Sequence, residues 1–581
     1  MCAARLGQAR DSHPQSQQIV SVTATAPAIV PRSGPPSLHL VGGMLVLLLV
    51  GIVTTAPVVV VILGSFDGDA WLETLSNPVN RNAILASVVL ALRAPIAAVL
   101  GFLIAWLLIR IKLPGGKFLE FAMWITFFLP ILPLTLSWIL LLSPRYGIVN
   151  LALEKLPFIS GAPFNIYSIG GILWVHLTAS SVPVMVVLLG PAIRQLDASY
   201  EEVGRVCGLR PFAIFRQITL PILMPAILTA ALAGFIKSLE AFEVERILGP
   251  PANIFVYSTR IYDLISWEPP LFNDAMALSA LVLSGLLALA IVYQKWMRHY
   301  SYATILGREA SRQQLDIGPA AWAASAILFL IVAISLFFPL VTLLLGSFMK
   351  LFGFFSIPSP YVLAHWRQVF ADPVFLHSLW NSLLISTGAG LGGVFIYSMI
   401  AYLLVRSRIP GRNLVELLTW LPWTIPGILL SVACLSLMLS TPLSFLYGSI
   451  LSLILILIIS QMPIGVHMMK TSVLQIGTEL EHSARLCGAG PIRTFFAIIL
   501  PLIRPMLVSI FVIVFISAIR DISTIIFMAN ANTKTLSLLM LEFAASSNLE
   551  DGAVIGVVTT AIVIVVAALA RRFGLNLFAQ R

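Results

Sequence analysis

Two ionisable residues stand at equivalent places in two long apolar stretches. Glu240 lies in FIKSLEAFEVERILG (235–249) and Arg520 in FISAIRDISTIIFMA (515–529), 280 positions further on. Ionisable side chains are costly in apolar surroundings, where they usually face a cavity or a partner of opposite charge. An acid and a base placed in this way could pair with each other where two related stretches meet.

Other polar residues flank this pair. A second interpretation is local, because Lys237 and Glu240 are three residues apart and could pair along one helix. Arg93, in LALRAPIAA, is a further charge in an apolar stretch, and the sequence gives no account of it. The candidate residues of this charged group are Lys237, Glu240, Glu243, Arg520, Asp521 and Ser523.

A polar segment is also repeated at the same spacing. EEVGRVCGLRPFAIFRQITLP (201–221) matches EHSARLCGAGPIRTFFAIILP (481–501) without a gap. The positions retained in both copies are Arg205 and Arg485, Cys207 and Cys487, Gly208 and Gly488, Pro211 and Pro491, and Leu220-Pro221 and Leu500-Pro501. We call these segments the first and second islands. The repetition favours a docking surface over a simple loop whose helices lie at the lipid surface.

Each island is predicted to form two short helices separated by a glycine turn. Asp197 can cap a first helix that begins near Ala198, and Thr478 with Glu481 has capping-box spacing in the second copy. Gly208 and Gly488 would end these helices in the left-handed conformation. The prolines that follow suit the first turn of the next helix.

The composition requires a membrane. The chain of 581 residues is 59% hydrophobic and 10% charged, with a mean hydropathy of +0.97. Soluble domains have about 25% charged residues. Continuous apolar runs of about 20 residues are typical of spanning helices, so we predict an all-α polytopic membrane protein. The twelve predicted spans are 41–64, 83–109, 118–142, 168–190, 222–245, 272–294, 320–347, 381–405, 414–439, 446–469, 502–528 and 553–570.

The repeat divides these spans into two parallel six-helix repeats. Six is even, so both halves enter the membrane in the same sense. The predicted parts are a disordered cytoplasmic tail (1–40), a first half (41–294), a cytoplasmic linker (295–319) and a second half (320–575). Lys and Arg gather in the alternate loops that would be cytoplasmic, which places both termini in the cytoplasm. The net charge of +10 then reflects these loops, and no nucleic-acid partner is predicted.

Motifs for catalysis are missing from the sequence. There is no Walker A loop, H-E-x-x-H or G-x-S-x-G, so we expect a transport protein without its own ATPase motif rather than an enzyme. None of the four cysteines has zinc-site spacing, no structural disulfide is expected, and a metal site stays unknown. A secondary transporter with two six-helix halves is a rival interpretation, and a membrane-embedded enzyme is a more distant one.

The islands resemble the EAA motif of binding-protein-dependent ABC importer permeases, which is Glu-Ala-Ala, three residues, Gly, nine residues and Ile-x-Leu-Pro. In the first island Glu202 takes the acidic position, followed by Gly208, Ile218, Leu220 and Pro221. In the second island His482 takes that position, with Glu481 beside it. The chain is thus similar to a fused type I importer permease, and several outer segments resemble those of ferric-iron permeases.

This resemblance implies a subunit of the bacterial inner membrane. Its islands would act as coupling helices on two copies of a separate ABC ATPase, which binds the ATP, so the chain itself needs no cofactor. A periplasmic binding protein would deliver the solute, with ferric iron expected and thiamine, polyamine or phosphonate as alternatives. The coupling residues that the resemblance implies are Glu201, Glu202, Gly208, Leu220, Pro221, Glu481, His482, Gly488, Leu500 and Pro501. The charged group around Glu240 and Arg520 would line the translocation path or its gate.

Overall fold

The computed structural model describes residues 38–66, 68–159, 161–197, 199–299, 314–407 and 409–572. Over these ranges the chain is built from helices, with two isolated β-bridges, which confirms the all-α prediction. The predicted tail (1–40) lies almost wholly outside the described residues, and so do residues 300–313 of the predicted linker.

The helices of the first half are α1 (Leu38–Gly64), α2 (Gly68–Ser76), α3 (Pro78–Ala91), α4 (Arg93–Arg110), α5 (Gly116–Phe128), α6 (Ile131–Leu142), α7 (Ile148–Leu153), α8 (Ile169–His176), α9 (Val182–Gln195), α10 (Ser199–Val206), α11 (Pro211–Ile214), α12 (Leu220–Leu239), α13 (Glu243–Leu248), α14 (Tyr257–Ser266) and α15 (Phe272–His299). Those of the second half are α16 (Ala320–Val332), α17 (Phe338–Ser347), α18 (Ala364–Ala371), α19 (Pro373–Arg406), α20 (Arg412–Leu418), α21 (Leu421–Thr424), α22 (Gly427–Ser440), α23 (Ile450–Leu474), α24 (Glu479–Leu486), α25 (Pro491–Thr494), α26 (Leu500–Leu502), α27 (Arg504–Ile519), α28 (Leu536–Ala545) and α29 (Leu549–Arg572).

Three of the twelve predicted spans are sharply bent. Among the described residues nine helical segments are long and apolar enough to cross a membrane, and twelve result if each bent pair is one span. The predicted span 118–142 bends by 104° between α5 and α6, and 414–439 bends by 109° before α22. Both bends lie at prolines, Pro130 and Pro426, which cannot donate the backbone hydrogen bond that a continuing helix needs. The third bend, of 78°, comes before α27.

Two spans end earlier in the structure than the sequence predicts. The helix predicted over 222–245 ends at Leu239, and the helix predicted over 502–528 ends at Ile519. Glu240 and Arg520 are the residues that follow these helices and lie at their C-caps. The charged residues therefore mark helix ends inside the protein rather than positions along a continuous span.

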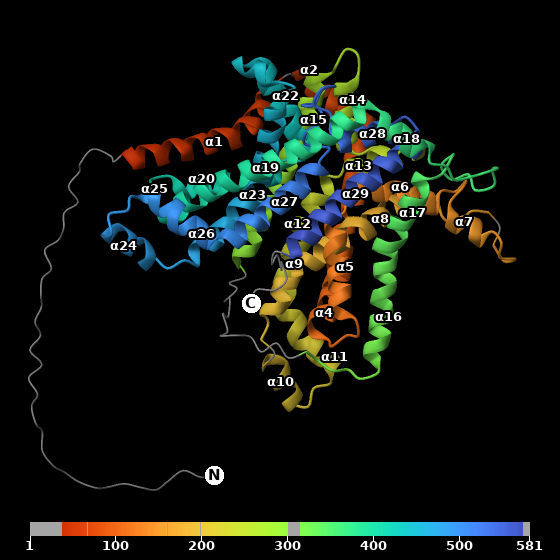
Figure 1. Cartoon of the computed structure of the whole chain (residues 1–581), viewed down its shortest axis with the longest axis horizontal. Helices are drawn as coiled ribbons and strands as arrows, with labels where there is room; N and C mark the ends of the chain where they lie inside the picture. Colours follow the sequence, from red (N-terminus) through yellow and green to blue (C-terminus); the bar gives the residue numbers. More distant parts are fainter. Residues whose placement is uncertain are drawn as a thin grey trace, which may run out of the picture.

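The first helices of the two halves pack on both halves. Helix α1 packs on α20 and α22 of the second half and on α15 of its own, while α16 and α17 pack on α5 and α6 of the first half and α17 also packs on α29 (Figure 1). The rings of Phe118 on α5 and Phe329 on α16 stack with centroids 5.9 Å apart. Backbone hydrogen bonds join residues 110–112 to Leu315. Each half of the sequence is thus completed by a helix of the other half.

The two groups of helices form diverging arms. In Figure 1, α4, α5, α9 and α12 run toward α10, whereas α19, α23 and α27 run toward α24. The arms converge around α6, α13 and α28, which contact one another. The two islands therefore lie at the far ends of separate arms, and the charged residues at the helix ends lie where the arms meet.

Candidate coupling helices and charged path

Both islands fold as the sequence predicts. In the first, α10 ends at Val206 and Gly208 follows with a φ of +80°, and in the second α24 ends at Leu486 and Gly488 follows with the same φ. The residue after each glycine donates its N–H back five positions, from Leu209 to Gly204 at 3.0 Å and from Ala489 to Ala484 at 2.9 Å. This bond is the signature of a helix ended by a left-handed residue.

The segments that leave the islands also repeat. Short helices begin at Pro211 and Pro491, and a π-helical turn follows in each copy, at Phe215–Thr219 and Phe495–Ile499. The Leu-Pro pairs 220–221 and 500–501 then start the next helix, α12 or α26. Pro211 and Pro491 lie in first turns, where a missing N–H leaves no bond broken, whereas Pro221 and Pro501 come just after the π-helical turns.

The printed contacts at the starts of the two islands involve different partners. Oδ1 of Asp197 accepts a hydrogen bond from the N–H of Ser199 at 3.0 Å, as the capping prediction requires. In the second island, Oε1 of Glu481 lies 2.6 Å from Nε of Arg406. The capping box between Thr478 and Glu481 stays a prediction.

The first two residues of each island differ in burial. Glu201 and Glu481 are both buried, at 3% exposure, whereas Glu202 and His482 are exposed. The departure from the EAA pattern at His482 therefore falls on an outward-facing position. The acid that both islands retain is the buried one, a residue earlier in the chain.

Each island presents apolar side chains to the outside. Val206 is 88% exposed and Leu486, its equivalent, is 89% exposed, while Phe212 and Ile492 on the following helices are also exposed. Such side chains at the tip of an arm form an apolar surface next to charged positions. Exposed apolar groups rimmed by polar residues are typical of interaction sites.

The charged group at the helix ends is arranged differently from the predicted cross-half pair. Oε2 of Glu240 accepts a hydrogen bond from Nζ of Lys237 at 2.9 Å, which is the local interpretation. The guanidinium of Arg520 instead donates to the carbonyls of Phe127 at 3.1 Å and Leu129 at 3.4 Å, at the bend between α5 and α6. Glu240 and Arg520 are therefore bound to other partners in this conformation.

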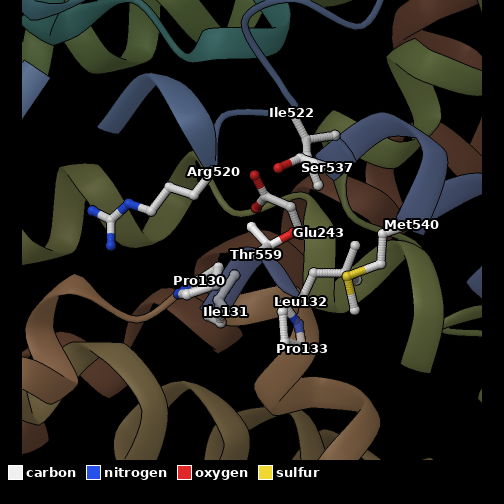
Figure 2. A pocket seen from close by; sticks show the side chains of 10 residues that line it. All are labelled: Pro130, Ile131, Leu132, Pro133, Glu243, Arg520, Ile522, Ser537, Met540 and Thr559. Carbon is white, nitrogen blue, oxygen red and sulfur yellow. The ribbon is translucent and has the colours of Figure 1, made fainter. Parts of the chain in front are cut away.

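The remaining predicted residues of this group lie close by. Asp521 accepts hydrogen bonds from the N–H and the hydroxyl of Thr524, at 3.0 and 2.9 Å. The Ser523 hydroxyl lies against Gly427 at the start of α22, where an added Cβ would be 2.5 Å from it. Figure 2 shows Glu243 and Arg520 lining one small cavity, with the guanidinium pointing away from the Glu243 carboxylate.

Contacts between the halves also involve this group. Nζ of Lys237 lies 4.7 Å above the ring of Trp423, in the second half. Tyr262 on α14 stacks on Phe527 with centroids 5.7 Å apart. Lys237 and Arg520 thus each reach from one half to the other, which places the charged group at the junction of the arms.

A buried cluster of three ionisable residues was missed by sequence reasoning. Nε2 of His176 lies 2.8 Å from Oε1 of Glu245, and Nη1 of Arg93 lies 4.0 Å from the same oxygen. Arg93 also donates to the carbonyls of Leu90 at 2.8 Å and Ser238 at 3.0 Å. The one signal in the sequence was Arg93, a charge in an apolar stretch. Its cluster partners His176 and Glu245 lie far away in the sequence, and only the fold brings them to Arg93.

This cluster borders a cavity in the first half. The cavity has a volume of about 230 Å³ and lies between α4, the region around His176 and the end of α12. Its charged or ionisable lining residues are Arg93, His176, Lys237, Glu240 and Glu243. In the part of the chain that the structure describes, no group of three or more His, Cys, Asp and Glu side chains is arranged to hold a metal ion. The lining of the cavity therefore carries both positive and negative side chains.

The sequence of this chain is similar to those of known transport proteins. The chain is 25% identical over 392 residues to a ferric transport system permease protein FbpB of Actinobacillus pleuropneumoniae, covering 67% of this chain and 55% of that protein. It is 22% identical to the Fe(3+)-transport system permease protein FbpB 2 of Haemophilus influenzae, over 87% of this chain and 92% of the relative. A molybdate/tungstate transport system permease protein WtpB of Pyrococcus abyssi is 27% identical over 30% of this chain and 67% of its own length.

The chain thus spans little more than half the length of the first of these relatives. The family model described as "Binding-protein-dependent transport system inner membrane component" matches twice, over residues 97–301 and 393–581. Each match contains one island and the helices around it, so the family unit itself is duplicated. The chain therefore belongs to the family of binding-protein-dependent transport system inner membrane components, with two copies of the family domain fused in one polypeptide.

Proposed function

We propose that this chain is the permease subunit of an ABC importer that moves ferric iron into the bacterial cytoplasm. The observation that carries the proposal is the pair of equivalent islands, each with a glycine-ended helix and an exposed apolar residue, at the tips of two arms. Two copies of one docking surface suit a partner with two equivalent sites, such as a dimer of ATPase subunits.

The energy for transport then comes from outside the chain. The sequence has no Walker A loop, and its family is that of a transport component. Val206 and Phe212, with Leu486 and Ile492, would seat in clefts of two ATPase subunits, and Glu202 and His482 would lie at the rims. Because the two rim positions differ in charge, the two docking contacts differ in polarity.

The orientation follows from the same surfaces. ATP is cytoplasmic, so α10 and α24 face the cytoplasm, and so do both termini. The arms diverge on that side and meet around α6, α13 and α28, which corresponds to an inward-facing conformation (Figure 1). The charged group at the junction of the arms then lies on the solute path at its outer, closed end, where a periplasmic binding protein would release the solute.

Ferric iron is supported by the relatives whose names state a ferric substrate, because their matches cover 67% and 87% of this chain. The molybdate/tungstate relative matches over only 30% of this chain. Oxyanions, thiamine, polyamines and phosphonates are thus the alternatives to be excluded by direct measurement.

The test is uptake and partner capture with the full chain in its own host. Affinity purification in mild detergent should bring down an ABC ATPase and a binding protein that holds ferric iron. Deletion of the chain should abolish uptake of radioactive ferric iron and leave molybdate uptake unchanged. Loss of molybdate uptake instead, or purification without any ATPase, would contradict the proposal.

A further inference from the structure

An arginine at the end of a long span holds the chain just before each island. Arg110, the last residue of α4, donates from Nη2 to the carbonyl of Leu196. Arg406, the last residue of α19, donates from Nη2 to the carbonyls of Val473 at 3.1 Å and Ile476 at 2.6 Å. Leu196 and Ile476 are 280 residues apart and the two arginines are 296 residues apart, so the same anchor recurs in both halves, with the offset changed between the span and the island.

Each island has a buried acid near the segment that its arginine holds. In the second half, Oε1 of Glu481 is 2.6 Å from Nε of Arg406, and both side chains are mostly buried. In the first half, Glu201 and Arg110 are both buried, at 3% and 4% exposure, and Arg110 binds the chain at Leu196, shortly before Glu201. A buried charge is stable only if it is paired or hydrogen-bonded, so the two acids and the two arginines depend on each other.

The first half has an additional bond that the second lacks. The hydroxyl of Thr219 donates to Oε1 of Glu201 at 3.0 Å. The equivalent position in the second half is Ile499, which is fully buried and has no polar side-chain atom. The buried acid of the first island therefore has a hydroxyl donor at the position where the second half has an apolar side chain.

We propose that Arg110 with Glu201, and Arg406 with Glu481, are positioning pairs that make each coupling helix move as one body with a long span. The proposal rests on the coupling role proposed above for the islands. Helix α4 links the two regions of the first half directly, because it begins at Arg93, beside the cavity, and ends at Arg110. Its 18 residues span about 27 Å at 1.5 Å per residue. A displacement of α10 by the ATPase would thus reach the charged cavity through a single helix.

Hydrogen exchange on the purified full chain in nanodiscs tests the pairs without any partner. Glu481→Gln removes the charge and keeps the shape, and it should raise amide exchange in α24 about tenfold, because local opening free energies set exchange rates. Glu201→Gln should raise exchange in α10 less, since the Thr219 hydroxyl can still donate to the amide oxygen. Glu479→Gln is the matched control, because Glu479 is an exposed acid on the same helix as Glu481.

Exchanging the residue that differs between the halves sharpens the test. Adding Ile499→Thr to Glu481→Gln should bring exchange in α24 back toward the wild type. Adding Thr219→Ile to Glu201→Gln should raise amide exchange in α10 to the level seen in α24 of the Glu481→Gln variant. Unchanged exchange in both Gln variants, or a control that behaves like Glu481→Gln, would overturn the proposal.

A second readout separates positioning from simple stabilisation. In the complex captured with its ATPase and binding protein, Glu481→Gln should lower solute moved per ATP hydrolysed several-fold, with ATP hydrolysis retained. Raised exchange with an unchanged transport ratio would overturn the positioning role. Failure of the islands to cross-link to the ATPase would instead contradict the proposed docking, and the exchange result would still report on the pairs themselves.

Discussion

The two halves of this chain are alike at their islands and unlike where they meet. Both islands keep a glycine at φ +80°, a buried acid and an arginine anchor. At the junction, His176 and Glu245 of the first half correspond at the 280-residue spacing to Ile456 and Ile525, which are buried and apolar. The two proposed docking sites would impose the same requirements twice, whereas a single solute path would need each half to contribute different side chains.

The largest effect should come from breaking the buried cluster that only the first half has. Glu245→Leu leaves the buried Arg93 without its carboxylate, which typically costs about 3–5 kcal/mol. Replacing both, with Glu245→Leu and Arg93→Ala, removes the unpaired buried charge and should recover most of the stability. Thermal unfolding of the purified protein, followed by gel filtration, measures both variants. A double variant as unstable as the single one would show that the cluster is not an ionic unit.

A smaller, symmetrical effect is expected at the island glycines. An added Cβ at Gly208 or Gly488 meets no neighbouring atom, so only the left-handed backbone opposes it. Val at either position should cost about 1–2 kcal/mol locally and reduce solute uptake in both cases, with membrane insertion retained. Uptake assays and membrane fractionation check this. Loss in one variant only would break the equivalence of the two islands.

Thiol labelling should reveal only a small difference between the islands. Cys207 and Cys487 are exposed at equivalent places, whereas Cys434 is buried. An impermeant maleimide should label both exposed thiols at rates within about threefold of each other in opened membranes and neither in intact cells, because thiol reactivity follows exposure. Labelling of either cysteine from outside intact cells would contradict the orientation proposed here.

The smallest effect concerns Glu240 and Arg520, which do not bond to each other in this conformation. Glu240→Gln and Arg520→Gln should act additively on stability, within about 0.5 kcal/mol, as expected for residues without a shared contact. Glu240→Gln with Lys237→Met should be non-additive, since those two side chains are hydrogen-bonded at 2.9 Å. A coupling energy well above this limit between Glu240 and Arg520 would mean that a second conformation, in which they pair, is populated.

Local sequence patterns were sufficient for the islands and insufficient for the charged path. The turn at Gly208 depends on residues within a few positions, so the predicted helix, glycine and proline order is confirmed. Arg93 finds its partners 145 residues away at Ser238 and further on at Glu245, which no periodicity reveals. The repeat indicated that Glu240 and Arg520 are equivalent, but equivalence did not establish contact, because Lys237 lies nearer to Glu240 along its own helix. Hydropathy likewise located the spans and missed the bends at Pro130 and Pro426.

The packing of each first helix on the other half has a consequence for how the protein is made. While a ribosome has synthesised only the first half, α5 and α6 lack α16 and α17, and α1 lacks the surfaces of α20 and α22 on which it packs. Until the second half is inserted, the surfaces of α1, α5 and α6 that pack on it remain exposed to the bilayer. Cleaving the finished chain between α15 and α16 should not release two halves, because each already holds a helix of the other.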